Sequence, residues 1–175
     1  MAAIEFAMVL PILFVMFVGT IELSQAITAD RRVTQIASST ADLVARTKTI
    51  KRCEIDGIMQ IVNHIIKPYS PADLQATIAS VVADPNNAAQ TTVAWSYHHN
   101  GGYGSNLSPG NTYTLPEGVV AAGDSVIVAS VRYTYNPTST PVMFSHFITA
   151  AIPLTETFFL KPRLSSTVEI SNDAC

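Results

Sequence analysis

The sequence predicts an α+β protein with a long N-terminal transmembrane and stalk helix, a second short helix, and a head built on an antiparallel β-sheet. Three observations support this class. Residues 1–21 form an apolar run with a single ionisable side chain, residues 23–66 carry apolar side chains at helical spacing, and four or five strand-like segments follow. Helices first and strands afterwards are typical of α+β architecture, in which the two kinds of element are segregated.

The composition excludes several classes of protein. The chain has 175 residues, 10 Lys and Arg against 13 Asp and Glu, and a net charge of -3. Hydrophobic residues make up 48% and charged residues 13%, the latter about half the usual share. A disordered chain would be rich in charge, and a nucleic-acid binder would carry a basic surplus. We therefore expect a folded domain with no nucleic-acid partner.

The first segment, MAAIEFAMVLPILFVMFVGTI, is apolar on every helical face. A helix of about 20 residues rises about 30 Å, which is enough to cross the hydrocarbon core of a bilayer. A cleavable secretory signal would need a basic start and a small-residue cleavage site, but the first basic residue is Arg31. Buried helices of soluble proteins are usually shorter. We therefore predict a transmembrane half-helix over residues 1–22.

Glu5 is the only ionisable side chain among the first 21 residues. One reading is that it lies near enough to the helix start to reach the membrane interface and to complement the helix dipole. The other is that it pairs with a cation inside the membrane or an assembly, because a carboxylate in an apolar span is costly. The nearest candidate cation is a free amino terminus. The residues alone leave both readings open.

Helical periodicity continues beyond the apolar run. Apolar or small side chains recur every three or four residues at Leu23, Ile27, Val33, Ile36, Ala37, Thr40, Leu43 and Val44, which indicates an amphipathic helix. We predict one helix from near residue 3 to about residue 50, with residues 23–52 as a stalk that packs on the head. On this prediction, Leu43→Asp loosens the head from the stalk.

The head is predicted to span residues 53–175. A second helix is expected at 54–66, because apolar residues repeat at i, i+3, i+4 and i+7 and Lys67-Pro68 ends the pattern. Strands are expected at 125–135 and 152–160, with a last short strand in 164–170. Residues 70–83 fit either a helix or a strand. Long loops are expected over 98–124 and 136–152.

Two strings resemble a known family. The start AAIEFAMVLPILF, with Glu5 followed by Phe6, and the later string FFLKPR at 158–163 resemble TadE/TadG-like minor pilins, or pseudopilins, of tight-adherence (Tad/Flp, type IV-like) pilus systems. The resemblance implies a pilin-like fold and favours a hairpin of strands 75–83 and 91–97. It also implies that a prepilin peptidase removes a short basic leader, so that Met1 is the first mature residue.

The resemblance implies a function in pilus assembly. The expected role is a minor pilin that primes, caps or supports a tight-adherence pilus used for surface attachment. Its assembly residues would be Met1, Glu5 and Phe6, with Glu5 neutralising a neighbour's amino terminus. Expected partners are other minor pilins, the major pilin as a further candidate, the prepilin peptidase, the inner-membrane assembly platform and, before assembly, membrane lipid. The expected location is the bacterial inner membrane with a periplasmic head, then the cell surface or pilus.

Two alternatives stay open. A tip adhesin would bind a surface or receptor through its long loops. The candidate contact residues for that role are Tyr103, Asn106, Met143, Phe144 and Phe147. The first loop is more simply a solvated connection rich in turn residues, whereas the second is too apolar to be left in water. The other alternative is a permanently anchored partner. Six of the ten basic residues lie within residues 31–52, soon after the span, so the positive-inside rule would place the head in the cytoplasm unless a basic leader precedes it.

The search for catalytic chemistry finds no Walker A loop, no G-x-S-x-G and no H-E-x-x-H. His98 and His99 are adjacent and would face opposite sides of a strand, which is poor metal geometry. We expect no enzyme, cofactor or metal site. The two cysteines, Cys53 and Cys175, suggest one disulfide on the oxidising side of a membrane, with free thiols or an intermolecular bond as alternatives.

Overall fold

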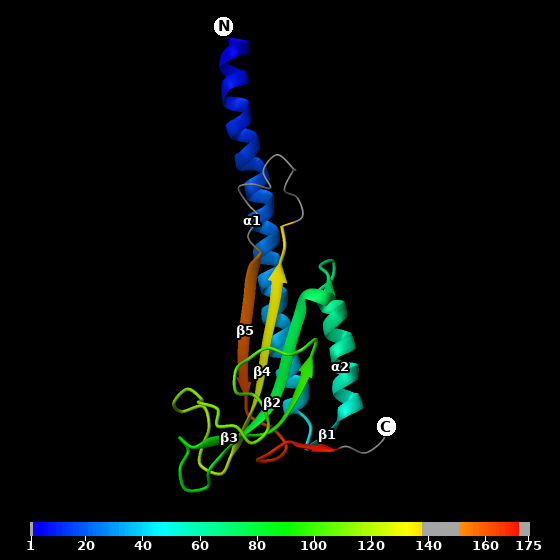
Figure 1. The fold of residues 1–175 in the computed structure, drawn as a ribbon, viewed down its shortest axis with the longest axis vertical. Coiled ribbons are helices and arrows are strands. Elements are labelled where there is room, and N and C mark those ends of the chain that lie inside the picture. The colour runs from blue at the N-terminus through cyan, green and yellow to red at the C-terminus, as the bar shows by residue number, and fades with distance from the viewer. Residues whose placement is uncertain (1, 138–150, 172–175) are drawn as a thin grey trace.

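One long helix dominates the structure. The computed structural model describes residues 2–137 and 151–171, and helix α1 (Ala2–Ala45) covers 44 of them. Its N-terminal half projects beyond the rest of the molecule, and its C-terminal half lies along the head (Figure 1). At 1.5 Å per residue the helix is about 66 Å long. The predicted α+β class is confirmed, with a helix that spans the apolar run without a break.

The end of α1 differs from the prediction of about residue 50. The helix stops at Ala45, and both the backbone N–H and the hydroxyl of Thr47 donate to the carbonyl of Val44. The chain then enters strand β1 (Thr49–Lys51), which pairs in parallel with β6 (Glu169–Ser171). Periodicity in the sequence does not reveal this short pair, because its partners are about 120 residues apart.

The second helix matches its prediction closely. Helix α2 (Arg52–Ile65) buries Ile55, Met59 and Val62, and the Glu54 carboxylate accepts the Lys51 backbone N–H at 2.8 Å where the helix begins. A single 3₁₀ turn, η1 (Pro71–Asp73), follows. The ambiguous segment 70–83 is therefore mostly strand.

Four antiparallel strands form the main sheet, in the order β3-β2-β4-β5. They are β2 (Leu74–Ala83), β3 (Thr91–His99), β4 (Ser125–Tyr135) and β5 (Ile152–Leu160). The central strands β2 and β4 are buried along most of their length, which explains their nearly continuous apolar sequences. The predicted hairpin, the 125–135 strand and the 152–160 strand are all confirmed.

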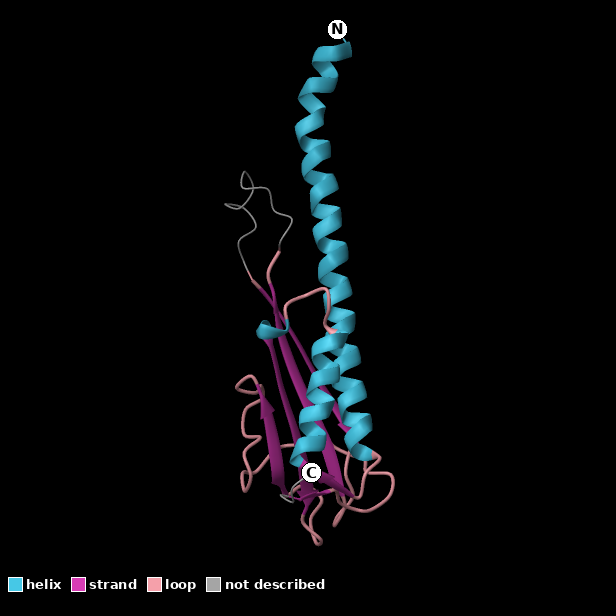
Figure 2. Ribbon diagram, turned by 90° about the vertical axis from the view of Figure 1, so that its right-hand side faces the viewer, coloured by secondary structure: helices cyan, strands magenta, loops and turns pink. Residues whose placement is uncertain are grey.

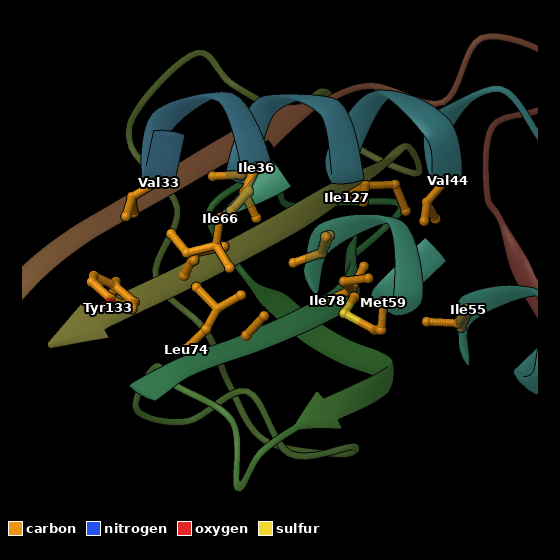
Figure 3. Close-up of a cluster of buried hydrophobic side chains, with 14 of the residues drawn as sticks. Val33, Ile36, Val44, Ile55, Met59, Ile66, Leu74, Ile78, Ile127 and Tyr133 are labelled. Atoms are coloured by element: carbon orange, nitrogen blue, oxygen red, sulfur yellow. The ribbon is translucent and has the colours of Figure 1, made fainter. Parts of the chain in front are cut away.

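Both helices cover one face of the sheet (Figure 2). In the core between them, side chains of α1 and α2 meet side chains of β2 and β4, with Val33, Ile36 and Ile66 on the helical side and Leu74, Ile78 and Ile127 on the sheet side (Figure 3). The stalk half of α1 thus shares one core with the head. The division of the chain at residues 22/23 and 52/53 stays a prediction.

The opposite face of the sheet is also apolar, and the segment between β3 and β4 covers it. Ala79, Val81, Val126 and Val128 on this face pack with Leu107, which is 1% exposed. The expected solvated connection is therefore corrected in part, because this loop closes a second small core. Because both faces of the sheet are apolar, each must pack against other parts of the chain.

The stripe on α1 is confirmed for residues 33–44 except at one position. Val33, Ile36 and Val44 are fully buried, whereas Leu43 is 39% exposed, and Leu23 and Ile27 are also exposed. Leu43 precedes Val44, and a step of one residue turns the helix by about 100°, so Leu43 points away from the sheet. The expectation that Leu43→Asp loosens the head stays a prediction, and the partial exposure of Leu43 indicates a smaller effect than a substitution at Ile36 or Val44 would have.

We predict that Ile36→Ala lowers the free energy of unfolding by about 2–5 kcal/mol, because it leaves a cavity in a closely packed core. Leu43→Ala is the matched control on the same helix and should cost less than about 1 kcal/mol, because Leu43 is partly exposed. Denaturant unfolding of the full chain in neutral detergent micelles measures both. Equal losses for the two variants would contradict the packing described for α1.

Candidate assembly surface

The projecting half of α1 presents apolar side chains to its surroundings on all sides. Every residue from Ile4 to Phe17 is exposed, and Ile4, Phe6, Met8, Ile12, Met16 and Phe17 are each 62–75% exposed. Within the described residues, α1 is the one helix long and apolar enough to cross a membrane, by length and composition. Such an apolar surface is costly in water, so lipid or another protein must cover it.

Two of the three predicted assembly residues lie on this surface. Glu5 is exposed in the first turn of α1, and the neighbouring Phe6 is 62% exposed. Met1 lies outside the described residues. The structure thus places Glu5 among side chains that suit lipid or a protein interior, where a carboxylate requires a partner.

A polar junction marks the place where α1 meets the head. Glu22 is 6% exposed, and its carboxylate accepts a hydrogen bond of 3.1 Å from the hydroxyl of Tyr135 at the end of β4. The hydroxyl of Tyr69 donates to the Gln25 carbonyl at 2.9 Å, and its ring packs edge-on against Tyr135 with centroids 5.9 Å apart. Burial, and then the bonded Glu22 carboxylate, raise the pKa of Tyr135 to about 12.

A second contact ties α1 to α2. The Arg32 guanidinium donates to the Ile65 carbonyl at 2.6 Å. Ile65 is the last residue of α2, where backbone carbonyls lack helical partners, and a cation is favoured there by the helix dipole. Arg32 therefore fixes the direction of α2 against the stalk.

Sequence reasoning missed Glu22, Tyr69, Tyr135 and Arg32 as a group. A signal was present, because Glu22 is the first charged residue after the apolar run. Its partner Tyr135 lies 113 positions away, and only the packing of β4 on α1 brings the two together.

The structure describes the candidate contact residues of the first loop but not those of the second. Tyr103 is half-buried, with the Arg132 guanidinium 5.6 Å from its ring centroid and its backbone N–H bonded to Thr77 at 2.9 Å. Asn106 is exposed and has a left-handed backbone with φ of 63°. Met143, Phe144 and Phe147 lie outside the described residues.

A glycine allows the first loop to approach the sheet. Gly102 has φ of 74°, and a Cβ there would lie 2.5 Å from Nδ1 of His98 and 2.7 Å from the Thr77 hydroxyl. His98 in turn lies 3.0 Å from that hydroxyl and 3.2 Å from the Ser96 hydroxyl. Any larger residue at position 102 would push the loop off the sheet.

The two adjacent histidines do face different surroundings. His98 contacts the loop, whereas His99 is on the side of Asp56 in α2. Burial lowers the pKa of His99, and Asp56 partly opposes that shift. Among the described residues no group of three or more His, Cys, Asp or Glu side chains is placed to hold a metal ion.

Cys53 lies at the start of α2, two residues after the end of β1. Cys175 lies outside the described residues, so the predicted disulfide stays a prediction. The parallel pairing of Lys51 with Ser171 is compatible with it, because it brings Ser171 beside the segment that carries Cys53.

The similarity to known proteins lies in the segment that forms helix α1. Residues 1–42 match the family model of TadE-like protein. The N-terminal region is TadE-like. No curated protein and no solved structure matches the chain. The TadE-like match covers the exposed apolar surface, Glu5, Glu22 and part of the docked stalk, and it implies a pilin-like protein associated with the tight-adherence pilus. Such proteins are typically not enzymes.

We predict that Tyr135→Phe lowers the free energy of unfolding by about 1.5–3 kcal/mol at pH 7, because it removes a hydrogen bond to the buried carboxylate of Glu22. This difference should shrink as the pH rises from about 10 to 12. The wild-type phenol ionises near pH 10 when unfolded and near 12 when folded, so its contribution is complete below pH 10 and is lost across that window.

Denaturant unfolding of the full chain in micelles at pH 7, 9, 10 and 11 measures this difference. Tyr103→Phe is the matched control, because it removes a phenol on the other face of the sheet, away from Glu22. A Tyr135→Phe difference that stays constant from pH 7 to 11 would contradict the Glu22–Tyr135 account.

Proposed function

We propose that this protein is a minor pilin that assembles with other pilin-like subunits and primes, caps or supports a tight-adherence pilus. The observation that carries the proposal is the form of α1. Its first half is exposed and apolar on every side, while its second half is fixed to the head by a shared core. A subunit of this form can exchange lipid for neighbouring helices around its first half without any change in its head.

Glu5 determines the register in which neighbouring subunits pack when lipid is exchanged for other helices. Removing a carboxylate from water costs several kcal/mol, and a nearby cation must offset that cost. The amino terminus of a neighbouring subunit is the cation that we assign to Glu5, and Phe6 beside it adds apolar contact. Subunits would therefore pack in one register, in which each Glu5 meets a positive charge.

Before assembly, the first half of α1 would lie in the inner membrane with the head on the periplasmic side. This location requires a prepilin peptidase that removes a basic leader, and an assembly platform that extracts the subunit. The leader would also reconcile this orientation with the basic residues after the span. Amino-terminal sequencing of protein purified from cells that express the whole gene tests this step, because a permanently anchored protein would keep its leader.

We predict that Glu5→Ala lowers incorporation into sheared pili at least about tenfold, which corresponds to about 1.4 kcal/mol of lost pairing, while the head keeps its unfolding midpoint. Quantitative immunoblots of pilus and membrane fractions measure the effect. Glu117→Ala, an exposed carboxylate in the loop before β4, is the control and should assemble normally. Normal incorporation of Glu5→Ala would sink the charge-pairing account.

A tip adhesin is the second candidate function. It is favoured by Tyr103, on the sheet face opposite the helices, because the Arg132 guanidinium packs over its half-buried ring and the Thr77 hydroxyl accepts its backbone N–H. A cleft of about 350 Å³ opens there beside Tyr103, Ser105, Tyr113 and Thr157. If α1 lies inside a fibre, this face points outward, and rigid tyrosines are effective contact residues.

For this candidate we predict that Tyr103→Ala reduces adhesion of piliated cells several-fold with unchanged pilus number, because it removes a preorganised aromatic contact. Asn106→Ala tests the same loop without altering the cleft lining. Deletion of the whole loop is unsuitable, because buried Leu107 would be lost with it. Adhesion by the Tyr103→Ala cells at the wild-type level would rule out this site.

A further inference from the structure

A cleft lies where the head meets the projecting half of α1. It has a volume of about 300 Å³. Its lining comes from α1, the turn between α2 and β2, and the end of β4, and consists of Gln25, Pro68, Tyr69, Ser70, Asp73, Tyr133 and Asn136. These residues lie outside the apolar surface of α1 and outside the loop that carries Tyr103.

The depth of the cleft along α1 matches the headgroup layer of a membrane. Residues 2–21 form about 30 Å of helix, the thickness of the hydrocarbon core. Gln25 follows four residues later, about 6 Å further along the axis. The headgroup region on each side of the core is about 5–7 Å thick. A lipid headgroup would therefore lie level with the cleft when the first half of α1 spans a bilayer.

The cleft suits a cation. Asp73 is its only charged lining residue, and among the described residues no hydrogen bond or ion pair to its carboxylate is found. Asp73 and Tyr133 both line the cleft, and burial, followed by the charge of Asp73, raises the pKa of Tyr133. The half-buried Tyr69 also lines the cleft, and a tyrosine ring can bind a cation over its face.

The neutral lining residues suit a group with several donors. The exposed Asn136 in the lining carries a side-chain carbonyl oxygen that can accept a hydrogen bond, and an ammonium group has three N–H donors and no acceptor. Just outside the cleft, Lys67 is exposed and precedes Pro68 of its wall. A positive charge next to a negative cleft matches a zwitterion whose phosphate lies beside its ammonium.

We propose that this cleft binds the primary ammonium headgroup of a zwitterionic phospholipid, with Asp73 as the anion that pairs with it and Tyr69 as the ring beneath it. The site would set how deep the head sits at the membrane before assembly. The proposal rests on the same membrane placement of α1 as the proposed function, but it does not require entry into a fibre.

Native mass spectrometry of the full chain in neutral detergent micelles tests the proposal. The probes are short-chain phosphatidylethanolamine and short-chain phosphatidylglycerol, offered together at equal concentration. We expect the wild type to retain the ethanolamine lipid at least about tenfold better, a difference of about 1.4 kcal/mol. Asp73→Asn should bring the ratio close to one, and Glu117→Gln, with the same loss of charge far from the cleft, should leave the ratio unchanged.

A second variant allows the proposal to be tested even if Asp73→Asn fails to fold. Asn136→Asp adds a carboxylate at an exposed position of the lining and should raise the ratio above that of the wild type. A wild-type ratio near one, an unchanged ratio for both Asp73→Asn and Asn136→Asp, or equal competition by soluble phosphoethanolamine would overturn the lipid assignment. These outcomes are distinct from a failure of Glu5→Ala to affect incorporation, which bears on the fibre alone.

Discussion

A single unbroken helix lies in two environments, and the rest of the structure depends on that constraint. Its first half is exposed and its second half packs in the core of the head. The first half of α1 is apolar all round and exposed, whereas from Ala29 onward one face is buried in the core of the head. Since α1 continues from one half to the other without a break, the head docks on the second half and leaves the first half exposed. The shared core, the Arg32 contact with α2 and the Glu22–Tyr135 hydrogen bond all serve this docking.

The sheet of the head also has apolar surfaces that other parts of the chain must cover. Its two central strands are buried on both faces, so the helices can cover only half of the apolar surface. The segment between β3 and β4 covers the other half through Leu107 and its neighbours. A segment rich in Gly, Ser and Asn thus has a structural role, and its freedom to bind a partner is limited to exposed groups near Tyr103.

The polar junction at Glu22 connects the two environments. Buried polar groups are costly unless they are paired, and here a carboxylate lies just beyond the stretch that would cross a membrane. Tyr135 and Tyr69 surround this end of the stalk, which is where tyrosines are favoured at a membrane interface. The cleft beside Tyr69 and Asp73, our proposed lipid headgroup site, opens at the same level. This end of the head therefore combines the contacts that fix α1 with the proposed lipid site.

The sequence by itself determined the elements whose signal is local. The apolar run, the periodic stripe over residues 33–44, the α2 pattern and the strands at 125–135 and 152–160 each follow from side chains a few positions apart, and Glu5 stood out as the one charge in its segment. Tertiary structure alone decided the β1–β6 pair, the outward direction of Leu43, the burial of Leu107 and the meeting of Glu22 with Tyr135. Each of these depends on groups brought together from distant parts of the chain or on which side of a helix meets the sheet, and local periodicity carries no information on either.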